Sequence, residues 1–232
     1  MQPASASIAN PCYWWYQARS RLLRVALGPF VPRGATLLDV GSADGPSVAW
    51  LDGSARRIPL DIDPTGLRAG GLCASALALP LREASLDVVS AFDVVEHFPD
   101  DVALLTELHR VLRPGGRLLV SVPAYQWAWS SFDRAAGHYR RYTRRSLLRL
   151  LASTGFAVER ATYAFAATFP FFAADRLRAN LLGGDPENVE ASSLPIGFQR
   201  LLERLCDVDR VLLRRWELPF GSSVFVAATR RG

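Results

Sequence analysis

The chain contains no lysine, so its 27 basic residues are all arginines, and they stand against 22 acidic residues for a net charge of +5. An all-arginine basic set is better explained by genome composition than by function. Because no compact module of basic and aromatic residues accompanies the charge, nucleic acid is not an expected partner. Cysteine is also scarce, since Cys12, Cys73 and Cys206 lie far apart without a Cys-x-x-Cys pair. This spacing excludes a disulfide framework and favours no zinc site.

Long hydrophobic runs are missing as well. The longest, at residues 161–174, is too short to span a bilayer and is interrupted by Pro170. The first ten residues lack the charged start and apolar core of a secretory signal. We therefore expect a cytoplasmic protein that does not insert stably into a membrane, with peripheral contact left open. Half of the 232 residues are hydrophobic, which is enough for the core of one α/β domain.

One stretch organises the chain: residues 36–45, Thr-Leu-Leu-Asp-Val-Gly-Ser-Ala-Asp-Gly. The apolar run predicts a buried strand, and Gly41 and Gly45 allow the backbone to turn sharply and approach a ligand. Dinucleotide-binding loops space their glycines as Gly-x-Gly-x-x-Gly. Here Asp39 precedes Gly41 by two positions and Gly45 follows Gly41 by four. The spacing disfavours a pyrophosphate-binding loop, and with it a nicotinamide-dependent oxidoreductase.

The same stretch, Asp39-x-Gly41-x-x-x-Gly45, resembles motif I of the class I S-adenosylmethionine-dependent methyltransferases, with Ala43 in place of the middle glycine. Three later stretches resemble, in the family's order, its "LPF-x-x-x-x-FD-x-V", "VLEH-x-x-D" and "LKPGG" segments. They are residues 78–89, 94–100 and 112–118. The resemblance thus extends over roughly residues 36–122 and implies a cofactor-binding methyltransferase core.

Hydrophobic periodicity predicts strands that alternate with helices. The strands are expected at 36–40, 57–61, 72–77, 86–92, 117–122, 156–163 and 222–229, and the helices at 14–30, 47–51, 100–112, 144–154 and 198–212. This order predicts an α/β fold with a Rossmann-like, seven-stranded, mostly parallel sheet, an antiparallel last strand and helices on both faces.

We expect a single methyltransferase domain over residues 1–232. It comprises an N-terminal helical segment (1–35), a cofactor-binding core (36–165), a helical insertion (166–221) and the last strand (222–232). The insertion is longer than an ordinary connection, so it needs structure of its own. It is the expected substrate region.

The resemblance implies that S-adenosylmethionine binds at the carboxyl ends of the strands and leaves as S-adenosylhomocysteine. Asp61 closes the second strand, where such folds place an acid for the ribose hydroxyls, and Asp63 is its competitor. Ser75 stands where the family commonly has an acidic residue facing the adenine amine, and a serine can still accept a hydrogen bond. The expected cofactor-binding residues are Asp39, Gly41, Ser42, Gly45, Asp61, Ile62, Ser75, Ala76, Phe92 and His97.

The changes at Ala43 and Ser75 keep a second interpretation open, a non-catalytic scaffold or partner protein with a methyltransferase-like fold. Under the catalytic interpretation, His138 is the first candidate for the base because an imidazole exchanges a proton near neutral pH. Asp133 is the expected orienting residue or alternate base, and His97 is the next candidate. No metal is expected, because no cluster of carboxylates and histidines has ligand spacing in the sequence.

The aromatic stretches at 13–16, 121–130 and 137–142 resemble small-molecule methyltransferases of bacterial glycan or secondary-metabolite pathways. That resemblance implies a small-molecule acceptor, methylated on a hydroxyl of a sugar, polyketide or lipid-linked metabolite. Arginine pairs in this region fit either phosphate recognition or a solvated helix start. The expected substrate residues are Trp127, Trp129, Arg140, Arg141 and Tyr142.

Overall fold

The computed structural model describes residues 13–182 and 195–232, apart from 54, 66, 68 and 69. Its strands form one sheet in the order β3-β2-β1-β4-β5-β7-β6. Their bounds are β1 Ala35–Val40, β2 Ala55–Asp61, β3 Leu72–Cys73, β4 Leu86–Phe92, β5 Leu112–Pro123, β6 Phe156–Ala164 and β7 Ser223–Arg230. Neighbours from β3 through β5 pair in parallel, whereas β7 is antiparallel to both β5 and β6. The predicted sheet with its antiparallel last strand is confirmed.

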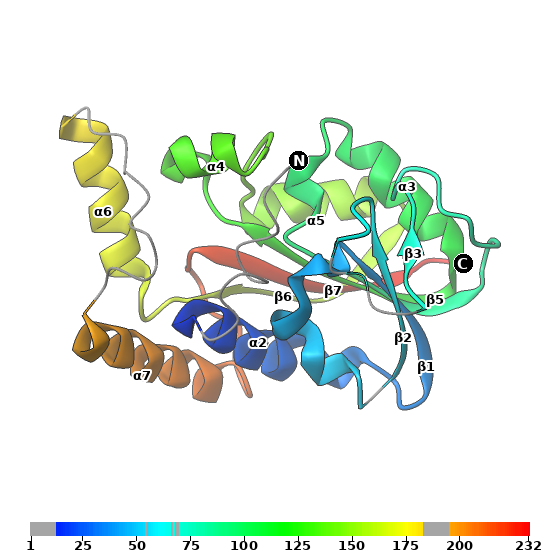
Figure 1. Cartoon of the computed structure of the whole chain (residues 1–232), viewed down its shortest axis with the longest axis horizontal. Helices are drawn as coiled ribbons and strands as arrows, with labels where there is room; N and C mark the ends of the chain where they lie inside the picture. The colour runs from blue at the N-terminus through cyan, green and yellow to red at the C-terminus, as the bar shows by residue number, and fades with distance from the viewer. Residues whose placement is uncertain (1–12, 54, 66, 68–69, 183–194) are drawn as a thin grey trace.

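Helices cover both faces of this sheet, with α3 and α5 on one side and α2 and α7 on the other (Figure 1). The α-helices are α2 Trp14–Leu27, α3 Asp101–Val111, α4 Ser131–Ala135, α5 Arg144–Ser153, α6 Phe169–Leu182 and α7 Ile196–Leu212. Short 3₁₀ segments are η1 Gly28–Phe30, η2 Ser42–Leu51, η3 Val95–His97 and η4 Gln126–Ala128. Because both faces are covered, the central strands are buried along almost their whole length.

Local chemistry explains where the helices over one face begin. The Asp100 side chain accepts a hydrogen bond from the backbone N–H of Ala103 at 2.8 Å and caps α3. Thr143 caps α5 in the same way, through the backbone N–H of Ser146 at 3.1 Å. Both caps satisfy backbone donors that a helix start otherwise leaves without partners.

Four elements differ from the sequence-based expectation. The first helix ends at Leu27 and continues as η1, because Pro29 has no N–H for an α-helical hydrogen bond. The segment after β1 is the 3₁₀ segment η2 rather than a short α-helix, and β3 has two residues rather than six. The insertion contains α6 in addition to the expected helix, and Pro170 lies in the first turn of α6, where proline is tolerated.

The position of the insertion follows from the antiparallel direction of β7. Because β6 and β5 are both antiparallel to β7, β6 ends and β7 begins at the same edge of the sheet at which the parallel strands end. Helices α6 and α7 therefore leave and return at that edge, and α6 projects from one end of the molecule (Figure 1). No helix among the described residues is long and apolar enough to cross a membrane.

Candidate active site

The turn after β1 requires a glycine at position 41. Gly41 has a φ of +70°, in the left-handed region. A Cβ atom built on it would lie 2.7 Å from Cγ2 of Val94, which follows β4. The turn and the segment after β4 are thus packed backbone to side chain, and only glycine fits between them. Gly45 lies within η2.

Asp39, near the end of β1, is buried and ties three strands together. Its carboxylate accepts a hydrogen bond from Ser90 Oγ of β4 at 2.7 Å and one from Arg57 Nη1 of β2 at 3.1 Å. Burial raises the pKa of the Asp39 carboxyl, while Ser90, Arg57 and Ser42 act to lower it. These bonds stiffen the strand ends beneath the motif I turn, and a direct contact of Asp39 with cofactor stays a prediction.

The residues expected to meet ribose and adenine lie at the ends of β2 and β3. Asp61 Oδ1 accepts a hydrogen bond from the backbone N–H of Asp63 at 3.0 Å, and the Asp61 carbonyl accepts one from Ala74 N. Ile62, next to this acid, is 75% exposed. Ser75 Oγ accepts from the backbone N–H of Leu77 at 3.2 Å. Ala76 and Phe92 of the same expected set are buried.

The segment after β4 is fixed by an arginine from the N-terminal helix. Asp93 has a φ of +54°, a conformation that aspartate tolerates better than most residues. Its carboxylate forms an ion pair with Arg19 of α2 at 2.7 Å and accepts a hydrogen bond from Ser121 Oγ at 3.0 Å. Sequence reasoning did not identify Arg19 or Asp93, because their pairing joins distant parts of the chain.

Glu96, in η3, is a fully buried acid in this segment. Its side chain has no exposed surface, and neither Oε1 nor Oε2 has a hydrogen-bond partner within the part of the chain that the structure describes. Burial raises the pKa of Glu96 well above its ordinary value; nearby Asp93 raises it further, and Arg19 and Arg141 oppose this. The backbone carbonyl of Glu96 accepts from Tyr139 N at 2.7 Å. This bond fastens η3 to the loop that follows α4.

That loop carries His138, which is held by a buried carboxylate. His138 Nδ1 lies 2.9 Å from Asp133 Oδ1, and Asp133 has no exposed surface. Arg141 donates to both carboxylate oxygens of Asp133, at 2.8 and 2.9 Å. Burial acts to raise the pKa of Asp133, but the hydrogen bonds from His138 and Arg141 outweigh it and lower the pKa to about 2. An ionised Asp133 favours a proton on His138 Nδ1 and leaves Nε2 with a lone pair.

The two histidines expected to act in catalysis lie side by side. The ring centroids of His97 and His138 are 4.6 Å apart, with the rings nearly perpendicular. Desolvation lowers the pKa of His97, the imidazole of His138 lowers it further, and Asp93 opposes both. The fold also adds Glu96, which sequence reasoning missed although it precedes His97 directly. Ligand atoms of Glu96, His97 and His138 all lie within 4.8 Å of one another.

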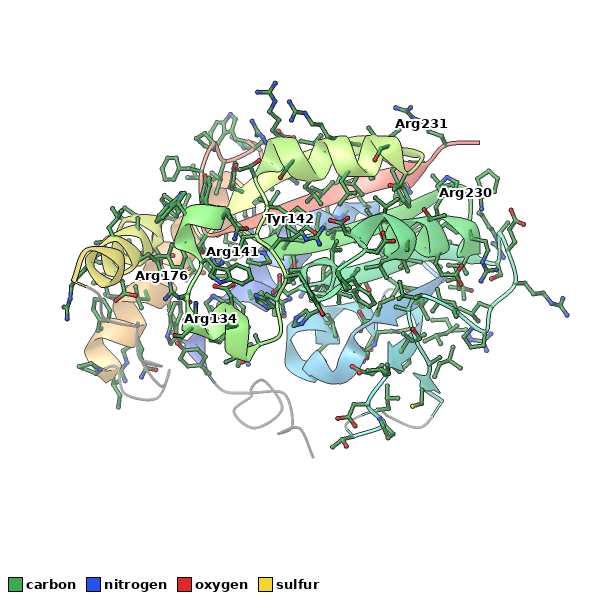
Figure 2. The ribbon with its side chains drawn as sticks, turned by 90° about the horizontal axis from the view of Figure 1, so that it is seen from above. Arg134, Arg141, Tyr142, Arg176, Arg230 and Arg231 are labelled. Atoms are coloured by element: carbon green, nitrogen blue, oxygen red, sulfur yellow. The ribbon has the colours of Figure 1, made fainter. Side chains whose placement is uncertain are left out.

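The expected substrate residues are divided between internal contacts and open surface. Tyr142 is buried, and its hydroxyl donates to Asp101 Oδ2 at 2.9 Å, as does Arg140 Nη1. Figure 2 shows Arg141 and Tyr142 within the body of the molecule, near α4. Trp127 is 43% exposed and stacks on Tyr125 with 5.9 Å between ring centroids. Trp129 is partly buried.

A mainly apolar cavity of about 210 Å³ opens where the insertion meets α2. Its walls include side chains of α2, of the β6 to α6 connection, of α6 and of α7. Among them are Trp14, Trp15, Phe165, Phe171, Phe172 and Leu202. Phe172 connects the cavity to the histidines, because the guanidinium of Arg141 lies 5.9 Å from its ring and Arg141 holds Asp133. Two tryptophans of α2 thus line this cavity.

Comparison with known proteins identifies the family. A sequence profile described as a methyltransferase domain matches residues 14–161, more than half of the chain. An uncharacterized methyltransferase of Mycobacterium bovis is 30% identical over 168 residues, which cover 60% of this chain and 66% of that relative. One from Mycobacteroides abscessus is 33% identical over 134 residues, 49% of this chain and 52% of the relative. The chain thus matches just under two thirds of the first relative's length.

Solved structures agree on the fold. A geranyl diphosphate methyltransferase in complex with S-adenosylmethionine superposes with a TM-score of 0.60 at 20% identity, covering 92% of this chain and 84% of that one. The 1,6-didemethyltoxoflavin-N1-methyltransferase of Burkholderia thailandensis, bound to S-adenosylhomocysteine, gives 0.56 at 18% identity, covering 98% and 85%. The order of its strands, the glycine turn after β1 and the match to the domain profile together place this chain in the class I S-adenosylmethionine-dependent methyltransferases.

Proposed function

We propose that this protein transfers the methyl group of S-adenosylmethionine to a hydroxyl of a small-molecule acceptor, with His138 and Asp133 promoting loss of the hydroxyl proton. One observation carries the proposal. The imidazole of His138 is held at 2.9 Å by the buried Asp133, beside His97 and the segment that packs against the motif I turn. A group that can accept or release a proton beside the expected cofactor site supports the proposal.

The residues that we expect to bind the cofactor lie at the ends of the strands. The Gly41 turn follows β1, and the neighbouring β2 ends at Asp61 and is followed by the exposed Ile62. The resemblance implies such positions for residues that contact the methionine, ribose and adenine parts of the cofactor. The sulfonium already makes the methyl group electrophilic. The chain's task is therefore to hold acceptor oxygen, methyl carbon and sulfur in line and to exclude water.

The cavity beside α2 supports an acceptor with an apolar part. Its aromatic walls fit a polyketide, a sugar ring or the hydrocarbon of a lipid-linked metabolite. Arg141 and Arg176 both lie over the ring of Phe172, at 5.9 and 5.3 Å, and Nε of Arg176 has no hydrogen-bond partner. Figure 2 shows the two arginines at the same end of the molecule. They provide positive charge for an acceptor that carries an anionic group beside its apolar part.

The test of the cofactor is calorimetric titration of the full chain with S-adenosylmethionine, S-adenosylhomocysteine and NAD. We expect the two adenosyl ligands alone to bind, and Asp61→Ala to weaken them about tenfold or more, a change of about 1.4 kcal/mol. Binding of NAD instead would contradict the proposal. A folded chain that binds none of the three would favour the scaffold interpretation.

The test of the chemistry is methyl transfer to a panel of hydroxylated sugars, polyketides and lipid-linked glycans, followed by release of S-adenosylhomocysteine. With an accepted substrate, His138→Ala is expected to lower turnover about 100-fold or more while the affinity for S-adenosylhomocysteine stays the same. His109→Ala is the control, because His109 of α3 packs against Phe156 of β6 instead of facing the other two histidines. Equal turnover in both variants would remove His138 from this role.

A further inference from the structure

Three potential metal ligands meet in the site although the sequence separates them. Glu96 and His97 come from η3, and His138 comes from the loop after α4. Their ligand atoms lie within 4.8 Å of one another. Zinc holds such atoms at about 2.1 Å, so the ligands of a tetrahedral ion are about 3.4 Å apart. Small rotations of the three side chains would bring the ligand atoms from within 4.8 Å to about 3.4 Å of one another.

Glu96 gives the strongest reason to expect an ion. A carboxyl group with no exposed surface and, among the described residues, no hydrogen-bond partner at either oxygen is rare and costly, because burial removes its hydration without replacing it. The neighbouring charges do not neutralise it directly. Arg19 forms its ion pair with Asp93, and Arg141 forms its own with Asp133. Of these three acids, Glu96 alone has a side chain without a hydrogen-bond or ion-pair partner in the described part of the chain, and a cation beside it would supply one.

Asp133 gives a second, independent reason. Histidines that bind metals commonly donate their other ring N–H to a carboxylate, which fixes the tautomer and strengthens the ligand. His138 makes this contact through Nδ1, and Arg141 holds the carboxylate from the other side. His138 Nε2, on the opposite side of the ring, is thereby the nitrogen left for a metal ion.

We propose that Glu96, His97 and His138 bind one divalent transition-metal ion. Two imidazoles and one carboxylate form a donor set that suits Zn²⁺ and leaves a fourth coordination position open. His97 is exposed, so the site has access to solvent and to an acceptor. Ligand spacing in the sequence predicted no metal, because the third ligand comes from another loop.

The proposal deepens the proposed function, on which its chemical consequence rests. An ion bound here lowers the pKa of a hydroxyl that occupies the open position, and the released proton passes to solvent. His138 then promotes loss of the proton as a ligand of the ion rather than as its acceptor. Metal binding itself does not depend on methyl transfer and is measured separately.

The experiment uses the full chain after treatment with a chelator. Zn²⁺ is titrated by calorimetry and Co²⁺ by visible absorption, because four-coordinate Co²⁺ has an intense and characteristic spectrum. We expect one ion per chain, and at least about 100-fold weaker binding in His97→Ala and Glu96→Gln. Asp133→Asn is expected to weaken binding by about 10- to 100-fold, as for other groups that orient a metal-binding histidine. His109→Ala serves as the control and is expected to bind like the parent.

Each outcome decides the proposal. Failure of the folded parent chain to bind either ion, or equal loss of affinity in His97→Ala and His109→Ala, would overturn it. Because His97 is exposed, His97→Ala is expected to fold even if Glu96→Gln does not. Titration of the same samples with S-adenosylhomocysteine separates the two proposals. Binding of the nucleoside without the metal overturns the metal site alone, and binding of the metal without the nucleoside overturns the proposed function alone.

Discussion

Arg19 and Asp93 are joined by a 2.7 Å ion pair between the N-terminal helix and the end of β4. The arginine is 2% exposed, and its guanidinium also lies 5.5 Å from the ring of Trp15. The pair holds the start of the segment that carries Glu96 and His97. Helix α2 is thereby coupled to the edge of the sheet that carries the candidate site, in addition to packing against its face.

Removal of this arginine should be costly. Arg19→Met leaves Asp93 without its ion-pair partner, and we expect a loss of about 3 kcal/mol in the free energy of unfolding. Urea denaturation measures the change. Arg21→Met, on the exposed side of the same helix, should change stability by less than about 0.5 kcal/mol. The double variant Arg19→Met with Asp93→Asn should regain part of the loss, since asparagine tolerates the positive φ; no recovery would contradict the assigned partner.

The Gly41 turn can be tested with a matched glycine. Gly41→Ala and Gly34→Ala impose the same strain, because the two glycines have φ values of +70° and +74°. Each should cost about 1–2 kcal/mol in unfolding free energy. Only position 41 adds the 2.7 Å approach to Val94. We therefore expect Gly41→Ala to weaken S-adenosylhomocysteine binding at least about tenfold in calorimetry while Gly34→Ala leaves it unchanged, and equal affinities would argue against the turn as a cofactor contact.

A larger side chain on α7 would fill the cavity that we propose for the acceptor. Leu202 is buried and lines the cavity, whereas its neighbour Leu201 is 45% exposed and does not. Leu202→Trp should abolish methyl transfer to an acceptor with an apolar part, at a cost of about 1–3 kcal/mol in stability, without changing S-adenosylhomocysteine affinity. Leu201→Trp should retain activity. Full activity in both variants would place the acceptor elsewhere.

Glu107 on α3 should make stability depend on pH. It accepts from Arg110 Nε and Nη2 and from the backbone N–H of Leu79, each at 2.7 Å. The hydrogen bonds from Arg110 lower the pKa of Glu107, while desolvation opposes them. A lowered folded pKa means that its contribution is complete above the ordinary value of 4.5 and is lost as the pH falls.

Because glutamine does not titrate, Glu107→Gln should cost about 1 kcal/mol at pH 7, and the difference from the parent chain should shrink as the pH falls below about 4.5. Urea denaturation over that range measures it. Glu203→Gln on α7 is the comparison, since Glu203 forms no ion pair with any other residue that the structure describes. If the difference in unfolding free energy between the parent and Glu107→Gln grew at acidic pH, the carboxylate would act in another way.

The sheet could be predicted well from the sequence because each strand is specified by consecutive residues. Apolar runs such as residues 86–92 specify buried strands, and the spacing of Leu104, Leu105 and Leu108 specifies one face of α3. The sequence does not predict α6 because Pro170 interrupts its apolar run, although proline is compatible with a first helical turn. Cofactor positions followed from the family resemblance, and their roles stay predictions.

The candidate site was predictable where two partners lie close together in the sequence. Asp133 and His138 are five positions apart, and the structure brings them into hydrogen-bond contact, as an orienting role requires. Arg19 with Asp93 and Glu96 with His138 are pairs that tertiary folding alone brings together, so no local pattern reports them. The sequence shows an acid next to a histidine at Glu96 and His97. It does not show that this acid is buried without a hydrogen-bond partner among the described residues.

The reversed direction of β7 has a consequence for how this chain can diversify. Both attachment points of the insertion lie at the edge of the sheet where the parallel strands end, and the registers of β7 with β5 and β6 are formed by residues outside it. Residues between β6 and β7 can therefore be exchanged or lengthened without a shift in strand register. Under the proposed function, chimaeras that exchange this segment between relatives are expected to change the acceptor while the strands that carry the expected cofactor residues stay the same.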